Sequence, residues 1–494
     1  MSLILILIPI LAALAILTGG KAKPIATGAA ALNLILGLGS VFCWQSEVWS
    51  LTLPVLAKPN IHLALGFYDG MSVIMVALSV IVLFTATMSG KCPEGSEKLW
   101  YSSILFIGAG ALGAFLATDL FFFYAFHELA LIPTFLMIGM LGSGERKEAA
   151  WKITIYLALG SIILLAGLIY LVTASGAESW LFKDLLASSI DATSQTHIAA
   201  LLIVGFGVLI SLFPFHSWAA PAYAAAPAPV AMLHAGVLKK FGLYGLIRLY
   251  PMVATGMQDW LGWLIVLLLC NILWVGFVTI NQKRLDTMLG NSSVMHMGYI
   301  FLAFAALVEA GSFEANPLAK PAAVVLMFAH GISIALLFML TDTIRRKTGT
   351  VELAELGGLA KAAPRLAFLF GLAGMASIGL PGLANFSGEV LVFLSGFNSY
   401  QGEGFSCVQV ATILALWGVV ISAVYMLRAY RQTFQGPAVA HTDSEHVKDF
   451  GPFCQIPAAI LALALLVVGL YPNSLLVLLD QEIPAPVPTE AAEQ

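Results

Sequence analysis

The chain has 494 residues, of which 60% are hydrophobic and 10% charged, with a mean hydropathy of +0.93 and a formal net charge of −4. Soluble domains average about 45–50% apolar and about 25% charged residues, so this composition excludes an ordinary soluble protein and indicates an integral membrane protein. The five cysteines lie far apart without CxxC or Cys/His ligand spacing, which argues against haem, iron–sulfur and zinc sites and against a disulfide framework: Cys43, Cys92, Cys270, Cys407 and Cys454.

Apolar stretches long enough to cross a bilayer recur along the whole chain, since about twenty such residues suffice for a helix. The N-terminal stretch lacks the basic region of a signal peptide and more spans follow it, so we interpret it as the first helix. The sequence predicts an all-α polytopic membrane protein with about fourteen transmembrane helices, at residues 2–19, 25–45, 68–89, 101–118, 120–141, 153–174, 198–215, 228–250, 260–280, 294–310, 321–342, 366–398, 409–430 and 456–478.

Basic residues divide unequally between the loops. Loops after odd-numbered spans hold seventeen Lys and Arg residues, whereas loops after even-numbered spans hold four. Because cytoplasmic loops carry the excess of positive charge, this predicts basic loops in the cytoplasm and both termini on the outer side. We expect no soluble domain, and we expect the polar stretch DQEIPAPVPTEAAEQ to be a short disordered end.

Proline and glycine interrupt two spans near mid-membrane, in LISLFPFHSWAAPAYAAAPAP and in ASIGLPGLANFSGE. Paired interruptions of this kind are typical of transporters built from internal repeats. Pro214 and Pro381 are 167 residues apart, and Glu128 and His296 are 168 apart. The similar offsets favour a five-helix unit, spans 4–8, repeated as spans 9–13. Because five is odd, the two copies would have opposite topology.

This repeat divides the chain into four predicted parts. Residues 1–100 hold the first three helices, 101–250 the first repeat and 251–435 the second repeat. Residues 436–494 hold the last helix and the polar tail.

Several ionisable side chains lie inside predicted spans, where each costs about 2.5–3.5 kcal/mol on insertion scales. Acids, imidazoles and amines spaced through a membrane can pass protons, because neighbours and burial adjust their proton affinities. Glu128 and Glu389 lie deepest in apolar runs, which favours a functional role for these two acids. The candidates are His127 and Glu128 in span 5, His216 at the first break, His234, Lys239 and Lys240 in span 8, His296 in span 10, His330 in span 11 and Glu389 in span 12.

A structural role competes with the functional one. His216 and His234 could equally be hydrogen-bonding core residues. Lys239 and Lys240 are adjacent, so they point about 100° apart on a helix. We expect only one of them to face the interior and the other to extend toward an interface.

The segment GAGALG, Gly108 to Gly113, formally matches the dinucleotide-binding pattern GxGxxG. It follows no strand and lies inside span 4, so close packing of helices through small residues explains it better.

Eight segments carry a resemblance to a known family. HELALIPTFLMIGM, LFPFHSW, AGVLKKFGLYGLIRL, SSVMHMGYIFLA, AHGISIALLFML, AELGGLAK, GLPGLANFSGEVLVF and YMLRAYRQTFQGP together resemble the antiporter-like subunits of respiratory complex I. The chain is most similar to the chain M type, with Mrp cation/proton antiporters and membrane-bound hydrogenases as relatives. The match follows nearly the whole chain in order.

The resemblance implies fourteen helices, inverted five-helix repeats around broken helices 7 and 12, and a file of charged residues and water parallel to the membrane. The family pattern GVLLKxG aligns with GVLKKFG, which places the family lysine at Lys240 rather than at Lys239. The proton relay implied by position is Glu128, Lys240, His296, His330 and Glu389, with His127, His216 and His234 as further candidates.

The first half of the chain departs from the family pattern. A lysine five residues before the PFH proline is replaced by Leu209, and WLPDAH…E is replaced by WAAPAYAA, which brings Pro221, Tyr223 and Ala225. The pattern DLKRLLAYSS becomes RLDTMLGNSS. The first half has therefore lost a central cation. Either His127, His216 or His234 substitutes for it, or this copy pumps differently or not at all.

The resemblance implies a proton-translocating membrane-arm subunit of an NADH:quinone oxidoreductase in a bacterial inner membrane. Such a subunit holds no cofactor or metal, and its partners are other membrane-arm subunits, lipid and protons, without nucleic acid. Two alternatives are a Mrp-type cation/proton antiporter subunit and a divergent structural paralogue that does not pump.

Overall fold

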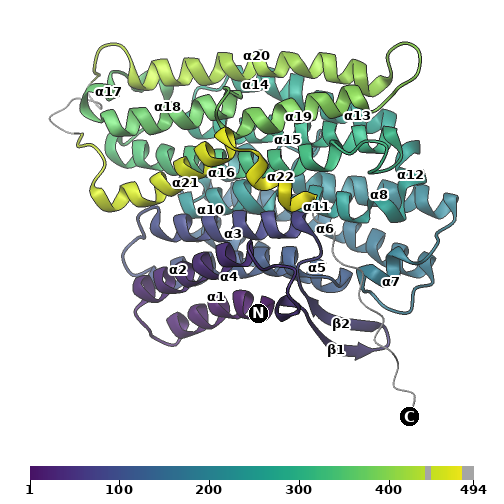
Figure 1. The fold of residues 1–494 in the computed structure, drawn as a ribbon. Coiled ribbons are helices and arrows are strands. Elements are labelled where there is room, and N and C mark those ends of the chain that lie inside the picture. Colours follow the sequence, from purple (N-terminus) through teal and green to yellow (C-terminus); the bar gives the residue numbers. More distant parts are fainter. Residues whose placement is uncertain (440–446, 481–494) are drawn as a thin grey trace.

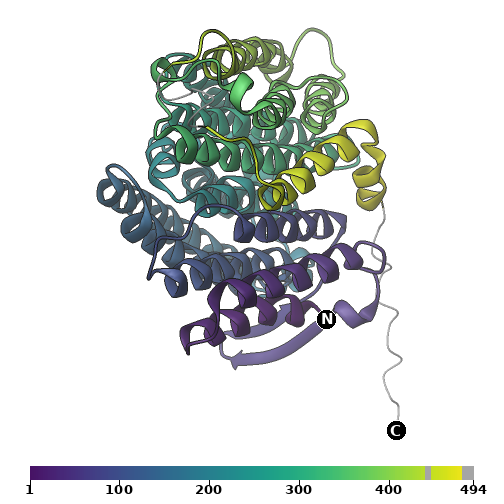
Figure 2. The same cartoon turned by 90° about the vertical axis from the view of Figure 1, so that its left-hand side faces the viewer.

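The computed structural model describes residues 1–439 and 447–480, with the side chains of 452–454 left out. Nearly all of the predicted polar tail lies outside these ranges. Helices run side by side in antiparallel fashion through the molecule, as Figure 1 shows. The N-terminal helices form one end of the stack and the second half of the chain forms the other (Figure 2).

The first half contains these elements: α1 (Ser2–Leu17), α2 (Ala22–Ser40), η1 (Glu47–Trp49), β1 (Leu51–Ala57), β2 (Asn60–Leu65), α3 (Gly70–Met88), α4 (Glu97–Leu116), α5 (Leu120–Leu141), α6 (Arg146–Ser175), α7 (Phe182–Leu186), α8 (Ala192–Ile210), α9 (Ala219–Ala225), α10 (Ala228–Leu233), the π-helical η2 (His234–Leu238) and α11 (Lys240–Leu249).

The second half contains these elements: η3 (Tyr250–Met252), α12 (Ala254–Asp259), α13 (Leu261–Leu269), the π-helical η4 (Cys270–Val275), α14 (Gly276–Ile280), α15 (Leu285–Ala310), α16 (Ala319–Thr348), η5 (Leu353–Glu355), α17 (Leu359–Ala362), α18 (Pro364–Ile378), α19 (Ala384–Asn398), α20 (Cys407–Phe434), α21 (Pro452–Leu470) and α22 (Asn473–Leu479).

Within the described residues, eleven helical segments are long and apolar enough to cross a membrane. The pair α21 and α22, bent by 74°, raises this number to twelve when counted as one span, and α1 and α18 are shorter apolar helices. The chain is therefore a multi-pass, mostly helical membrane protein, as the composition predicted.

A β-hairpin corrects the all-α expectation. Strands β1 and β2 pair antiparallel between α2 and α3, with Ala57 opposite Asn60 across a two-residue turn at Lys58 and Pro59. The stretch LTLPVLAKPNIHLAL is too short to span a membrane, and its β-branched residues and the proline in its turn suit a hairpin.

The glycines of GAGALG pack α4 against its neighbours, as predicted. A β-carbon at Gly110 would lie 2.6 Å from the carbonyl oxygen of Phe126 in α5, and one at Gly108 would lie 2.6 Å from Leu83 in α3. The approach of Gly110 to the α5 backbone leaves no room for a β-carbon, so the segment serves helix packing.

Both predicted interruptions are present. Helix α8 ends at Ile210, Ser211 adopts a left-handed conformation with φ 68°, and α9 begins only at Ala219. Helix α18 likewise ends before Gly379, whose φ is +84°, and α19 begins at Ala384. Each break brings loop backbone between helices that would otherwise be continuous.

An ion cluster ties three helices together at the end opposite the basic loops. The Asp69 carboxylate caps α3 by accepting from the Ser72 amide, and it accepts from Arg248 of α11 at 2.9 Å and from Lys320 of α16 at 2.7 Å. Burial raises the pKa of Asp69, but the two cations outweigh burial and hold that pKa well below its usual range. The cluster therefore joins the two halves of the chain.

Candidate functional site

The first group of polar side chains, which we call the Glu128 group, lies on α5 and α6. The Ser161 hydroxyl donates to the Glu128 carboxylate and lies 3.3 Å from the Tyr124 hydroxyl. His127 Nδ1 lies 3.3 Å from the same carboxylate, although neighbouring residues of a helix point in different directions. The Glu128 side chain is 35% exposed and borders a largely apolar groove of about 260 Å³ between α5 and α6.

No lysine or arginine forms an ion pair with Glu128 among the residues that the structure describes. Leu209, at the position where the resemblance places a lysine, is buried in the apolar core. The ion-pair partner of Glu128 is His127, and a histidine supplies a positive charge only when protonated.

An aromatic layer borders the Glu128 group on its inner side. The His127 ring stacks on Phe241 at 4.0 Å between centroids, and Phe241 stacks on Phe123 at 4.3 Å. Phe241 directly follows Lys240 in α11. Within the described part of the chain, no hydrogen bond joins the Glu128 group to the lysines of this helix.

The second group, which we call the histidine group, joins α11 to α15, α16 and α19. Lys239 Nζ lies 3.3 Å from Ser293 Oγ, which lies 3.2 Å from His330 Nε2. The rings of His330 and His296 stack at 5.3 Å, and His296 Nε2 lies 4.0 Å from a Glu389 carboxylate oxygen. All five side chains are buried, and each can hold or pass a proton.

His296 is held by two backbone carbonyls. Its Nδ1 lies 2.8 Å from the Ser292 oxygen and its Nε2 lies 2.9 Å from the Ser377 oxygen at the end of α18. A carbonyl oxygen only accepts hydrogen bonds, so both contacts are satisfied together when both ring nitrogens carry protons. The arrangement thus suits the charged imidazolium, with Glu389 beside it.

The second helix break makes room for the Glu389 carboxylate. A β-carbon at Gly379 would lie 2.2 Å from a carboxylate oxygen of Glu389, and the left-handed backbone at Gly379 also disfavours any other residue. The interruption of α18 and α19 therefore has a local function: it accommodates the acid.

The expectation that one of the two lysines extends to an interface is wrong. Lys239 is 1% exposed and Lys240 is 0% exposed. Their span lies in the middle of the helix stack and is buried on all sides, and the π-helical turn η2 directly precedes them. Lys240 Nζ donates to the Ala235 carbonyl at 2.6 Å, whereas Lys239 contacts the histidine group.

The two remaining histidines differ in their surroundings. His234 Nδ1 lies 3.1 Å from the Tyr223 hydroxyl, next to the lysines. His216 stacks on Phe213 within the first break and has no hydrogen bond or ion pair with either group among the described residues. Sequence reasoning missed three hydroxyls that link the candidates: Ser161, Ser293 and Tyr223. Ser293 could have been found, because it lies three residues before His296 and so one helical turn away.

Comparison with known proteins assigns this chain to a family. A family model described as "NADH:quinone oxidoreductase/Mrp antiporter, TM" matches residues 117–415. The chain is 31% identical over 483 residues to NAD(P)H-quinone oxidoreductase chain 4 1 of a Synechococcus species, covering 95% of this chain and 89% of the relative. It is also 31% identical over 410 residues to NADH-quinone oxidoreductase subunit M of Rickettsia felis, covering 83% and 80%.

Solved structures share the fold. A chain of respiratory complex I from Thermus thermophilus superposes with a TM-score of 0.86 at 26% identity, covering 97% of this chain and 98% of that one. A chain of the Mrp complex from a Dietzia species superposes with a TM-score of 0.81 at 19% identity over 97% of each chain, which shows the fold alone. The chain belongs to the NADH:quinone oxidoreductase/Mrp antiporter family of membrane subunits.

Proposed function

We propose that this chain is a proton-translocating membrane-arm subunit of an NADH:quinone oxidoreductase, complex I, coupling electron transfer in other subunits to proton movement. Relatives at 31% identity are chains of quinone oxidoreductases, and the complex I fold extends over 97% of this chain. The carrying observation is the buried series of proton-holding side chains that runs from Ser293 through His330 and His296 to Glu389.

In this proposal the relay consists of Lys240, His330, His296 and Glu389, with Glu128 as the acid of the first half. A proton moving through the series is held in turn by groups that accept and release it. Against a membrane potential, moving each charge costs about 2.3 kcal/mol per 100 mV. The chain would hold no redox cofactor, so this energy would arrive from neighbouring membrane-arm subunits.

The finer architecture belongs to the same proposal. Adding α1, the broken α18–α19 and the bent α21–α22 to the eleven spans would bring the number of membrane helices to fourteen. Ser211 and Gly379, which end α8 and α18 with positive φ, are 168 residues apart, like Glu128 and His296. This correspondence supports inverted repeats at 101–250 and 251–435, flanked by 1–100 and 436–494.

The proposed setting is a bacterial inner membrane, with both termini on the outer side. The asymmetry of basic loops supports this orientation. Other membrane-arm subunits would flank the chain. The apolar groove beside Glu128 lies on the surface of the helix bundle, where lipid or a neighbouring subunit would contact it.

The test is Glu389→Gln in the intact complex, reconstituted into vesicles. We expect fewer protons moved per quinone reduced, because glutamine keeps the size of the side chain but cannot take up a proton. An unchanged proton-to-electron ratio would refute the proposed relay.

A Mrp-type cation/proton antiporter subunit is the second candidate, supported by the shared fold and the family description. Sodium-dependent flux without NADH would favour it. A structural paralogue that does not pump is the third, supported by the missing cation beside Glu128. Unchanged pumping and assembly after joint neutralisation of Glu128 and Lys240 would favour that reading.

A further inference from the structure

A narrow cavity leads inward from the end where the basic loops gather. It lies between the break after α9, the start of α15 and the end of α16, and about 10 Å³ of it is open to the centre of a water molecule. That space is close to what one bound water requires. Its polar lining consists of Tyr223, Asp286, Thr341, Asp342 and Arg345, and the buried Thr341 hydroxyl has no hydrogen-bond partner among the described residues.

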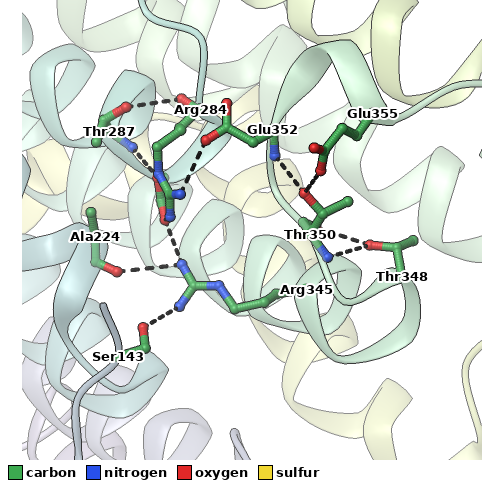
Figure 3. A network of polar contacts seen from close by, with 10 residues as sticks. Ser143, Ala224, Arg284, Thr287, Arg345, Thr348, Thr350, Glu352 and Glu355 are labelled. Atoms are coloured by element: carbon green, nitrogen blue, oxygen red, sulfur yellow. Dashed lines mark hydrogen bonds and ion pairs between the residues drawn. The ribbon is translucent and has the colours of Figure 1, made fainter. Parts of the chain in front are cut away.

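Arg345 lies at the rim of this cavity. Its guanidinium donates to Asp286 at 2.5 Å. It also donates to the Ser143 hydroxyl at 3.1 Å and to the Ala224 carbonyl at 3.4 Å (Figure 3). Two wider cavities of about 430 and 290 Å³ border the same Ser143. Space large enough for water therefore borders the rim on both sides.

At its inner end the cavity meets Tyr223, which contacts two ionisable groups. The Tyr223 hydroxyl lies 3.1 Å from His234 Nδ1, and Lys239 Nζ lies 5.7 Å from the centre of the Tyr223 ring. His234 is 3% exposed, and its Nε2 has no partner within the described part of the chain. A buried ring nitrogen without a partner points to a bound water or a proton acceptor beside it.

Lys239 connects Tyr223 and His234 to the histidine group. It is buried without an ion pair among the described residues, and its hydrogen bond to Ser293 reaches His330 in one further step. The family pattern has leucine at this position, so Lys239 is an addition of this chain. The addition accompanies the loss of the cation at Leu209.

We propose that Lys239 is a proton-relay residue that loads His330 from the cavity bordered by Asp286, Asp342 and Arg345, by way of Tyr223 and His234. The inference rests on the proposed function. It assigns a role to three side chains, Tyr223, His234 and Lys239, that the family pattern does not supply.

The transfer balances as a relay of one proton. His234 releases the proton on Nε2 to the neutral Lys239 amine through one water, and accepts the Tyr223 hydroxyl proton on Nδ1. Tyr223 regains a proton from bulk solvent through water in the cavity. The Lys239 ammonium then donates through the Ser293 hydroxyl to His330 Nε2, which leaves the amine neutral. His234, now protonated on Nδ1, returns to its Nε2-protonated tautomer before the next cycle.

The test uses Lys239→Arg and Lys239→Met in the intact complex in proteoliposomes. Arginine keeps the positive charge but cannot release its proton, whereas methionine removes the charge. We expect both variants to slow proton transfer through this chain by about 10²-fold, as removal of a positioned acid–base group does. The loss of this chain's contribution lowers the number of protons moved per quinone reduced, which is the readout, with the amount of assembled complex measured in parallel.

Tyr223→Phe provides an independent probe, because it removes one hydroxyl and keeps the ring. Tyr250→Phe is the matched control, since Tyr250 is also buried but donates to the Leu307 carbonyl away from this route. We expect Tyr223→Phe to lower the ratio, Tyr250→Phe to leave it unchanged, and Tyr223→Phe with Lys239→Met to lower it no further than Lys239→Met alone.

The outcomes separate this inference from the proposed function. If Glu389→Gln lowers the proton-to-quinone ratio while Lys239→Arg and Tyr223→Phe leave it unchanged, the Lys239 route is refuted and the relay stands. If Glu389→Gln also has no effect, the proposed function itself fails. A normal ratio in Lys239→Arg together with a low ratio in Lys239→Met would show that Lys239 acts only through its charge, which also overturns the route.

Discussion

The Glu128 group and the histidine group use similar residues in opposite environments. The Glu128 side chain is 35% exposed, and its only ion pair among the described residues is with its neighbour His127. The Glu389 side chain is 5% exposed and faces an imidazole held by two carbonyls. Lys239 contacts the histidine group through Ser293, while the His127 ring of the Glu128 group stacks on Phe241. The comparison shows that the packing of the surrounding helices decides whether an acid in a transmembrane helix has buried partners.

Removing the Ser293 hydroxyl from the histidine group should have the largest effect on proton transfer. Ser293→Ala removes the only link between Lys239 and His330 among the described contacts. We expect proton transfer through this chain to slow by about 10²-fold, which lowers the number of protons moved per quinone reduced in vesicles. Ser292→Ala is the matched control, because the Ser292 hydroxyl contacts Tyr425 instead. Equal effects of the two substitutions would contradict a specific role for Ser293.

A smaller loss is expected from Gly379→Ala at the second break. The added methyl group collides with the Glu389 carboxylate, and the left-handed backbone costs about 1–2 kcal/mol for a residue other than glycine. We expect pumping to fall several-fold while the complex still assembles. Gly436→Ala, which has positive φ but open space around it, controls for the backbone cost. A normal proton ratio in Gly379→Ala would show that the position of Glu389 is not critical.

Leu209→Lys sharpens the comparison by returning a cation to the first half. Alone it should change pumping little, because the histidine group is intact, and it should lower stability since a buried lysine costs about 2.5–3.5 kcal/mol in a membrane helix. Its informative effect is on Glu128: Glu128→Gln should cost more pumping in the Leu209→Lys background than in the native chain. Identical costs in the two backgrounds would contradict the idea that Glu128 lacks a cation.

The ion cluster at Asp69 lies outside both groups and should affect stability rather than pumping. Asp69→Asn leaves Arg248 and Lys320 without their carboxylate, which we expect to cost about 2 kcal/mol. Because the folded pKa of Asp69 is depressed, its contribution is complete above the unfolded pKa of about 4 and is lost as the pH falls further. The thermal midpoint of the purified complex should therefore drop below pH 4 in the native chain and depend less on pH in the variant.

Much of the fold follows from the sequence, because hydrophobic length and proline–glycine interruptions are local properties. Both helix breaks and the packing role of GAGALG were predicted in this way. The hairpin at Leu51–Leu65 was missed because it is short and connects two spans. The hydrophobic pattern of the span also could not show that Glu128 borders a groove on the surface of the helix bundle. Lipid-facing and interior-facing positions of a span are equally apolar.

Lys239 and Lys240 show how far the sequence alone could predict the candidate site. Position in the family pattern selected Lys240, and the 100° separation on an ideal helix predicted that its neighbour points elsewhere. The π-helical turn His234–Leu238 and burial on every side of the span place both lysines inside, and Lys239 contacts Ser293. Such a choice depends on the helices packed around the span, which a single sequence does not reveal.

The central claim is that proton transfer depends on the histidine group more than on the Glu128 group. The most direct test compares Glu389→Gln with Glu128→Gln in equal amounts of assembled complex, by the number of protons moved per quinone reduced. The account predicts a large loss for Glu389→Gln and a clearly smaller loss for Glu128→Gln. An equal or larger loss for Glu128→Gln, or none for Glu389→Gln, would contradict it.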